Sequence, residues 1–104
     1  MLHKRARLNA EEVAEVLAKG RGRRGRILSV KFQATEYPFQ CAVIVPKKVA
    51  PSAVKRNQLR RAVYRALMTS SLPPTGRAIL FVQSIPTDNG ATEFTSDIKQ
   101  LLHV

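Results

Sequence analysis

Two segments with alternating apolar side chains constrain the fold of this chain more than any other feature. In residues 28–34 every second side chain is apolar, and the same period returns in residues 39–45 after a short turn. A period of two is typical of a strand that buries one face, so we expect the two strands to pair as an antiparallel hairpin. One buried sheet face is then expected from Leu28, Val30, Phe32, Ala34, Phe39, Cys41, Val43 and Val45.

Helical patterns flank these strands. Asn9 and Glu12 have the spacing of a capping box, which predicts a first helix that ends at Gly20. Ser52 is the expected cap of the longest helix, over residues 53–69, whose apolar side chains recur at helical spacing. Each helix therefore has one side suited to packing on the sheet.

The remaining elements complete a single small domain. A short apolar run at residues 78–82 predicts a third strand, and the apolar spacing in residues 94–102 predicts a last amphipathic helix. The order α-β-β-α-β-α predicts one α+β domain over residues 1–104, a two-layer sandwich of helices on a sheet. The ends, residues 1–8 and 103–104, are expected to be frayed.

Positive charge is concentrated in the first three quarters of the chain. The 104 residues hold 18 Lys and Arg against 7 Asp and Glu, a net charge of +11. Residues 1–77 hold 17 of the basic side chains and 4 of the acidic ones. With 44% apolar residues, the composition is that of a globular domain and not of a disordered basic tail. The charge predicts a polyanion as partner; the alternative is a solvated basic surface that only aids solubility.

The sequence offers no set of side chains for catalysis or metal binding by the polypeptide itself. A protein-only nuclease needs grouped carboxylates or a paired acid and base, whereas the acids here cap the first helix or are scattered singly. His3 and His103 lie at opposite ends, and Cys41 points into the expected core. We therefore expect no catalytic residue, no metal site and no cofactor. Without a membrane-length apolar run or a secretory leader, a cytoplasmic protein with no membrane partner is expected.

The most specific pattern lies on the helix expected at residues 53–69. It reads Arg56-Asn57-Gln58-Leu59-Arg60-Arg61, and the pair Lys47-Lys48 precedes the helix. A helical wheel shows which residues lie on the side of this helix that faces away from its apolar stripe. They are Asn57, Arg60, Arg61, Tyr64 and Arg65. Arginine and asparagine at one-turn spacing present donors to phosphates, 2′-hydroxyls and base edges. The helix is therefore a candidate RNA-binding element.

This pattern resembles the protein subunit family of bacterial ribonuclease P. The signature of that family is Arg-Asn-x-x-Arg-Arg followed by a further basic residue, after a strand that ends in Lys-Lys. An Arg-Leu pair at residues 7–8, Gly20 after the first helix and an arginine-rich linker at residues 21–26 also fit, as does the element order. The resemblance covers about residues 4–102.

The resemblance implies a function in tRNA maturation. Members bind a large catalytic RNA, and the complex, an endoribonuclease, removes the 5′ leader of precursor tRNA. The RNA carries the chemistry with Mg²⁺, so this chain is expected to be an accessory subunit whose partners are ribonuclease P RNA and precursor tRNA, with no obligate protein partner. The family fold contains a left-handed split βαβ crossover, where general statistics favour the right-handed form.

The resemblance implies a role for each residue of this chain that occupies a functional position of the family pattern. Expected RNA contacts are Lys47, Lys48, Lys55, Arg56, Asn57, Arg60, Arg61 and Arg65. The single-stranded leader is expected in a cleft between the first helix and the sheet, lined by Val13, Leu17, Ser29, Lys31 and Gln33. The family usually has phenylalanines where this chain has Val13 and Leu17. Because stacking on an aromatic ring contributes about 1–3 kcal/mol per base, leader binding is expected to be weaker or to come from elsewhere.

Other kinds of binding protein remain as alternatives. A ribosome-associated or other structural RNA-binding protein can use the same scaffold, and it would co-purify with ribosomal RNA and support no cleavage. A DNA-binding helix module is less favoured, because the basic helix follows a strand and not the short helix of a helix-turn-helix unit. A protein-only nuclease is the least favoured, for want of acidic residues.

Overall fold

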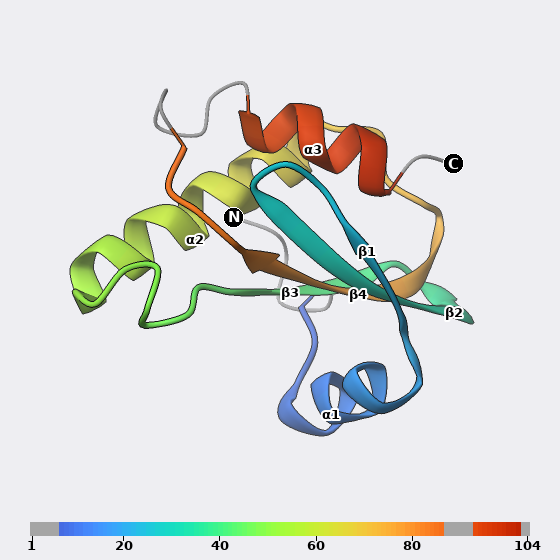
Figure 1. Ribbon diagram of the computed structural model, residues 1–104. Helices are drawn as coiled ribbons and strands as arrows, with labels where there is room; N and C mark the ends of the chain where they lie inside the picture. The colour runs from blue at the N-terminus through green and yellow to red at the C-terminus, as the bar shows by residue number, and fades with distance from the viewer. Residues whose placement is uncertain (1–6, 87–92, 103–104) are drawn as a thin grey trace.

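Four strands form one mixed sheet with helices on both faces (Figure 1). The computed structural model describes residues 7–86 and 93–102. In chain order the elements are α1 (Ala10–Lys19), β1 (Arg21–Arg24), β2 (Leu28–Pro38), β3 (Gln40–Ile44), α2 (Ala53–Met68), β4 (Thr75–Val82) and α3 (Glu93–Leu101). The strand order in the sheet is β1-β2-β4-β3, so the last strand of the sequence lies inside the sheet.

The two alternating segments form strands, but these strands do not pair with each other. β4 lies between them, antiparallel to β2 and parallel to β3, so the expected hairpin is wrong. Alternation determines which face of a strand is buried, but it does not determine which strand lies next to it in the sheet. β4 takes the inner position because both of its faces are covered, as the fully buried Ile79 and Leu80 show.

The arginine-rich segment expected to be a linker is an edge strand. β1 pairs antiparallel with β2, with Arg21 opposite Phe32 and Arg24 opposite Ser29. All four residues of β1 are exposed, so its sequence has no apolar alternation that would reveal a strand. The observed order is therefore α-β-β-β-α-β-α, one strand more than expected. Arginines on such an edge also oppose pairing with another chain.

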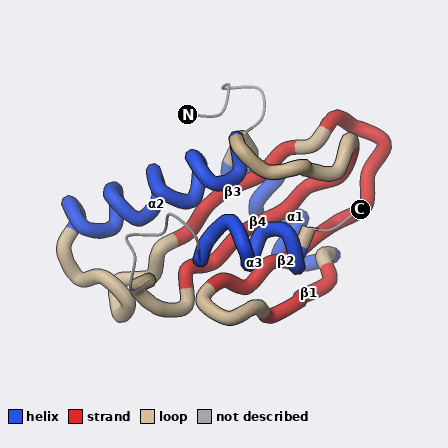
Figure 2. The backbone as a smooth tube through the Cα atoms, turned by 90° about the horizontal axis from the view of Figure 1, so that it is seen from above, coloured by secondary structure: helices blue, strands red, loops and turns tan. Residues whose placement is uncertain are grey.

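α2 and α3 cover one face of the sheet, and α1 lies on the other (Figures 1 and 2). The α+β class is confirmed, and α1 adds a third layer to the two that were expected. The core lies between the sheet and the α2–α3 layer, and its largest side chains include Leu28, Val30, Leu67, Leu80, Phe94 and Ile98. Ala34, expected in this core, is exposed, because β2 leaves its register with β4 after Gln33.

The caps expected from the sequence are present. The backbone N–H groups of Asn9 and Glu12 each donate to the other's side-chain oxygen at 2.9 Å. Ser52 Oγ accepts a backbone N–H from the first turn of α2 at 3.4 Å. α1 ends at Gly20, where a Cβ atom would lie 2.6 Å from the carbonyl oxygen of Val16. Glycine therefore allows the close N–H to carbonyl contact that ends this helix.

The segment before α1 is attached to the free edge of β3. Arg7 forms a parallel bridge with Cys41, and the Leu8 N–H donates to the Cys41 carbonyl oxygen at 3.0 Å. Residues 7 and 8 are thus paired and not frayed. His3 and His103 lie outside the described residues.

One arginine of β4 holds α1 on the sheet. α1 has one fully buried side chain, Val16, and depends on polar contacts for the rest of its attachment. Arg77 Nη2 lies 3.0 Å from Glu12 Oε2, and Nη1 lies 2.8 Å from Glu15 Oε2. The guanidinium group also donates to Gln40 Oε1 at 3.4 Å. Glu12 therefore binds this arginine as well as capping α1, and Glu15 in the next turn is its second partner.

Replacing Arg77 with methionine is expected to lower the free energy of unfolding by about 1–3 kcal/mol, because it leaves two partly buried carboxylates without their donor. Urea-induced unfolding measures the change. Lys19→Met is the matched control, because Lys19 meets Glu15 at 3.5 Å with 67% of its side chain exposed. Such a surface pair contributes about 0–1 kcal/mol. Equal losses in the two variants would contradict the anchoring role of Arg77.

Candidate nucleic-acid interface

α2 and the turn before it present the expected RNA-contacting residues on the surface. The exposed ones are Lys47, Lys48, Asn57, Arg61 and Arg65. The partly covered ones are Lys55, Arg56 and Arg60. Among residues 7–86 and 93–102 the ion pairs involve Arg77 and Lys19, and none involves these eight side chains. The seven positive charges among them therefore have no internal carboxylate partner in the described structure.

Three arginines converge on one flank of α2. Arg7, Arg60 and Arg61 line a pocket of about 260 Å³ together with Asn57 and Tyr64; we call it the Arg7 pocket. Arg60 Nη1 donates to Asn57 Oδ1 at 2.7 Å, which holds these two side chains side by side. Three guanidinium groups without an acid repel one another, so the pocket favours an anion. Forked guanidinium donors match phosphate oxygens in particular.

Tyr64 is a correction to the helical-wheel assignment. It was expected on the outer side of α2, but it is 5% exposed. Burial raises the pKa of its hydroxyl, because the phenolate would be desolvated. Burial likewise raises the pKa of the Cys41 thiol to about 12, which agrees with its position in the core. The segment at Arg7 reaches this flank from outside the helix, and a wheel drawn for α2 alone cannot include it.

Arg56 is turned toward its own chain. Its Nη1 atom donates to the carbonyl oxygens of Ala50 and Pro51 at 3.1 and 2.8 Å. These bonds tie the start of α2 to the turn that carries Lys47 and Lys48. Arg56 therefore positions the basic turn, which differs from the outward donor expected from the sequence.

The rest of the α2 set lies on the other flank of the helix. Lys55 and Arg65 line a pocket of about 230 Å³ with Gln58, Ile85 and Pro86. The residues expected to form one row thus divide between two flanks, with Arg60 and Arg61 on one and Lys55 and Arg65 on the other. An RNA bound along α2 would contact the helix from both sides.

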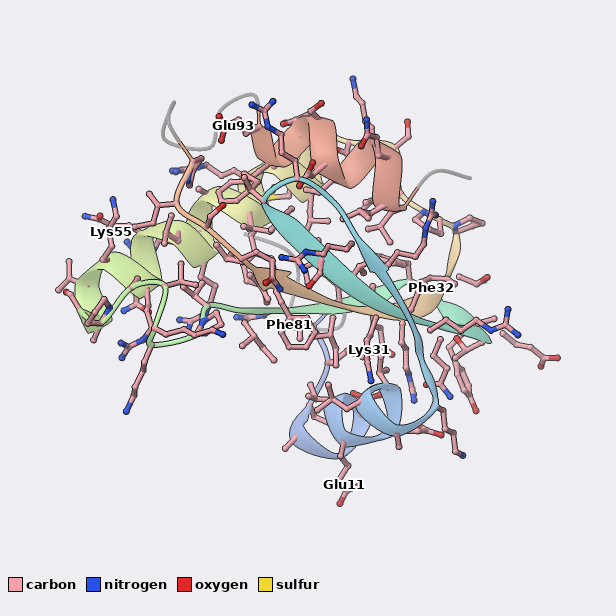
Figure 3. All side chains as sticks on the ribbon, viewed as in Figure 1. Glu11, Lys31, Phe32, Lys55, Phe81 and Glu93 are labelled. Carbon is pink, nitrogen blue, oxygen red and sulfur yellow. The ribbon has the colours of Figure 1, made fainter. Side chains whose placement is uncertain are left out.

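The residues expected to line a leader cleft lie on the α1 side of the sheet, but α1 covers some of them. Lys31 Nζ donates to the Leu17 carbonyl oxygen at 2.8 Å, so this lysine caps the end of α1 (Figure 3). Gln33 Oε1 is buried and has no hydrogen-bond partner among the described residues. Val13 is half-buried, and Leu17 is 41% exposed. Of the expected set, Leu17 is the exposed apolar group on this helix.

Ser29 belongs to a pocket that sequence reasoning did not find. This pocket, about 310 Å³, lies beside β1 on the sheet, and we call it the β1 pocket. It is lined by Gly22, Arg23, Arg24, Ser29, Val30, Lys31 and Phe81. No carboxylate lines it. Its residues come from three strands, and the strand order that joins them was not visible in the sequence.

The described residues contain no group of three or more His, Cys, Asp or Glu that could hold a metal ion. The helices in this part of the chain are too short or too polar to span a membrane. The charged surfaces of α2 and β1 are thus the main chemical features outside the core.

Fold and surface together define a small α+β protein with a concentrated basic surface. The family model for Ribonuclease P matches residues 2–103. The chain therefore belongs to the Ribonuclease P family, the family that its basic helix resembles. No curated protein sequence matches the chain.

Solved structures confirm the fold. The chain is similar to the RNase P protein of Staphylococcus aureus, with a TM-score of 0.75 and 20% identity over 93% of this chain and 92% of that one. It is also similar to the RNase P protein of Thermotoga maritima, with a TM-score of 0.73 and 16% identity over 92% of this chain and 94% of that one. At these identities the likeness concerns the fold and not the role of single residues.

Proposed function

We propose that this chain is the protein subunit of ribonuclease P, which binds the catalytic RNA through α2 and the 5′ leader of precursor tRNA through the α1 side of the sheet. The observation that carries the proposal is the Arg7 pocket, where Arg7, Arg60 and Arg61 meet Asn57 with no acid among the lining residues. RNA supplies the phosphates and 2′-hydroxyls that such donors bind. Family membership supports a place in an endoribonuclease complex.

In this assignment the protein binds and positions, and the RNA subunit hydrolyses the phosphodiester bond with Mg²⁺. Cations on α2 lower the repulsion between the RNA backbone and a second strand brought next to it. Leader and catalytic RNA are then held together by one protein, in the cytoplasm where precursor tRNA is processed.

Reconstitution with a ribonuclease P RNA at low magnesium is expected to speed leader removal above the rate of the RNA alone. Each phosphate that a Lys or Arg neutralises lowers log affinity by about 0.7–0.9 per log unit of salt. The six expected basic contacts other than Arg56 therefore predict a slope of about −4 to −5, measured by filter binding over a salt series. A slope near zero would contradict the proposal. Binding of ribosomal RNA without leader cleavage would favour the structural RNA-binding alternative.

Val13→Phe is expected to tighten binding of leader-bearing tRNA relative to mature tRNA by up to about 1–3 kcal/mol, because it adds an aromatic face beside the sheet. Equilibrium binding of both tRNAs to the reconstituted holoenzyme measures the difference. Ala18→Phe is the control, since Ala18 is exposed and lies on the outer side of α1. If both variants tighten leader binding equally, α1 does not direct its inner face to the leader.

A further inference from the structure

The aromatic residue of β4 lies on the α1 side of the sheet without being fully covered. Ile79 and Phe81 are two residues apart on one strand, so their side chains share a face. Ile79 is fully buried, whereas Phe81 is only partly covered. α1 therefore shields one end of this face and leaves the ring of Phe81 at its margin, as Figure 3 shows for the region between β4 and α1.

A cross-strand row connects Phe81 to the edge of the sheet. Ser29 pairs with Phe81 on one side and with Arg24 on the other, so all three side chains point to the α1 side. Gln83 Nε2 donates to Ser29 Oγ at 2.7 Å. Along β1, a Cβ atom at Gly22 would have no atom within 4 Å. The row therefore consists of the aromatic ring of Phe81, polar side chains next to it, and open space at the β1 edge of the sheet.

The three cationic side chains that line the β1 pocket differ in their hydrogen bonds to the rest of the protein. Arg23 Nη1 donates to the Leu101 carbonyl oxygen at 3.3 Å, which draws its guanidinium toward α3. Lys31 is held on the end of α1. Arg24 is exposed and has no ion pair within the described residues, so it is the cation that an incoming phosphate would meet. No acid opposes it in the pocket.

We propose that Phe81 is a stacking platform for one base of a single-stranded RNA, with Arg24 on the adjoining phosphate. An unpaired base offers a free π-face, whereas a base within a duplex has both faces stacked on its neighbours. A cation at the edge of the pocket can bind the phosphate of a nucleotide, and the aromatic ring can stack on its base. This inference rests on the proposed function, in which the single strand is the 5′ leader. It assigns to the sheet the stacking that α1, with Val13 and Leu17, does not supply.

The test combines Phe81→Leu with abasic substrates, in holoenzyme reconstituted with ribonuclease P RNA. Leucine keeps an apolar side chain and removes the ring. We expect affinity for leader-bearing tRNA to fall roughly 5- to 150-fold, the range for loss of one stacked base. Affinity for mature tRNA should not change. Abasic sites are then placed one at a time along the leader.

At one leader position the abasic site and Phe81→Leu are expected to be non-additive, because both remove the same stacking contact. Additive effects at every position would overturn the proposal. Phe32→Leu is the control for loss of an aromatic ring, since Phe32 lies on the opposite face of the sheet and packs against the core. Thermal unfolding of each variant identifies any loss of affinity that comes from a less stable fold. A wild-type protein that does not bind ribonuclease P RNA refutes the proposed function, which is a separate outcome.

β1 supplies a matched pair of charge variants. Arg24→Gln and Arg21→Gln remove the same charge from one exposed strand, and their side chains lie on opposite faces of the sheet. Arg24→Gln is expected to make the salt slope for leader-dependent binding shallower by about 0.7. Arg21→Gln is expected to leave it unchanged. Equal changes would show that β1 contributes a diffuse charge and not a phosphate contact beside Phe81.

Discussion

Replacing Arg60 and Arg61 together with alanine is expected to weaken binding of ribonuclease P RNA by about 100-fold and to change the free energy of unfolding by less than about 0.5 kcal/mol. Both guanidinium groups line the Arg7 pocket, and neither forms an ion pair with a described carboxylate. Their loss therefore removes two charge-assisted contacts to RNA, at about 1.5–3 kcal/mol each before partial compensation. Arg60 loses one exposed hydrogen bond, to Asn57, which contributes little to stability.

Filter binding at several salt concentrations, beside urea unfolding, measures both parts of this prediction. The slope of log affinity against log salt should become shallower by about 1.5, because two phosphate contacts are lost. Lys19→Ala/Lys99→Ala is the matched control, since it removes two charges from the exposed sides of α1 and α3. An equal loss of affinity in the control would mean that net charge, and not the Arg7 pocket, binds the RNA. A variant that unfolds would show that the arginines are structural.

Local patterns predicted the local structure of this chain well. The Asn9 capping box, the Ser52 cap and the stop at Gly20 each depend on contacts within a few residues, and the structure has all three. The buried faces of β2 and β3 were also predicted, because alternation within a strand decides which side chains share a face. The basic helix was predicted together with its family, because its motif is contiguous in the sequence.

What the sequence did not reveal depends on contacts between distant segments. β4 enters the sheet between β2 and β3, and nothing within those two strands records that neighbour. Tyr64 is buried on the flank reached by Arg7, 57 positions earlier in the chain. Phe81 lies in the short apolar run at residues 78–82, which predicts a strand but does not indicate which face of the sheet each side chain joins. The strand order places it opposite Ser29 of β2, in the same pocket as Arg24 of β1.

Two charged residues illustrate the same difference. In the sequence, Arg77 is one of 18 basic side chains, and Asp97 is an acid in the last helix with no other feature to mark it. The structure gives each a set of specific partners: Arg77 joins α1 to β4, and Asp97 joins α3 to the start of β2. Both bind groups more than 60 positions away in the chain. Charge patterns predict solvent-facing roles by default, so buried charged residues of this kind are missed.

Asp97 accounts for the turn that joins β1 to β2. Its side chain lies in α3, and the residue is 3% exposed. The Oδ2 atom accepts the backbone N–H groups of Ile27 and Leu28 at 2.7 and 2.8 Å. A Cβ atom at Gly25 would lie 2.9 Å from the same oxygen, so glycine lets the turn close around the carboxylate. The turn thus surrounds an anion that the protein supplies itself.

Asp97→Ala is expected to lower the free energy of unfolding by about 3–5 kcal/mol, because two buried N–H groups lose their shared carboxylate acceptor at once. For a domain of this size such a loss is a large part of the total stability. Asp97→Asn keeps one oxygen acceptor in a side chain of the same shape and should lose about half as much. Urea unfolding of both variants measures the difference; equal losses would mean that the charge, and not the acceptor geometry, holds the turn. Because this turn anchors β1, Asp97→Ala should also loosen the wall of the β1 pocket, and amide exchange should then rise first in residues 21–30.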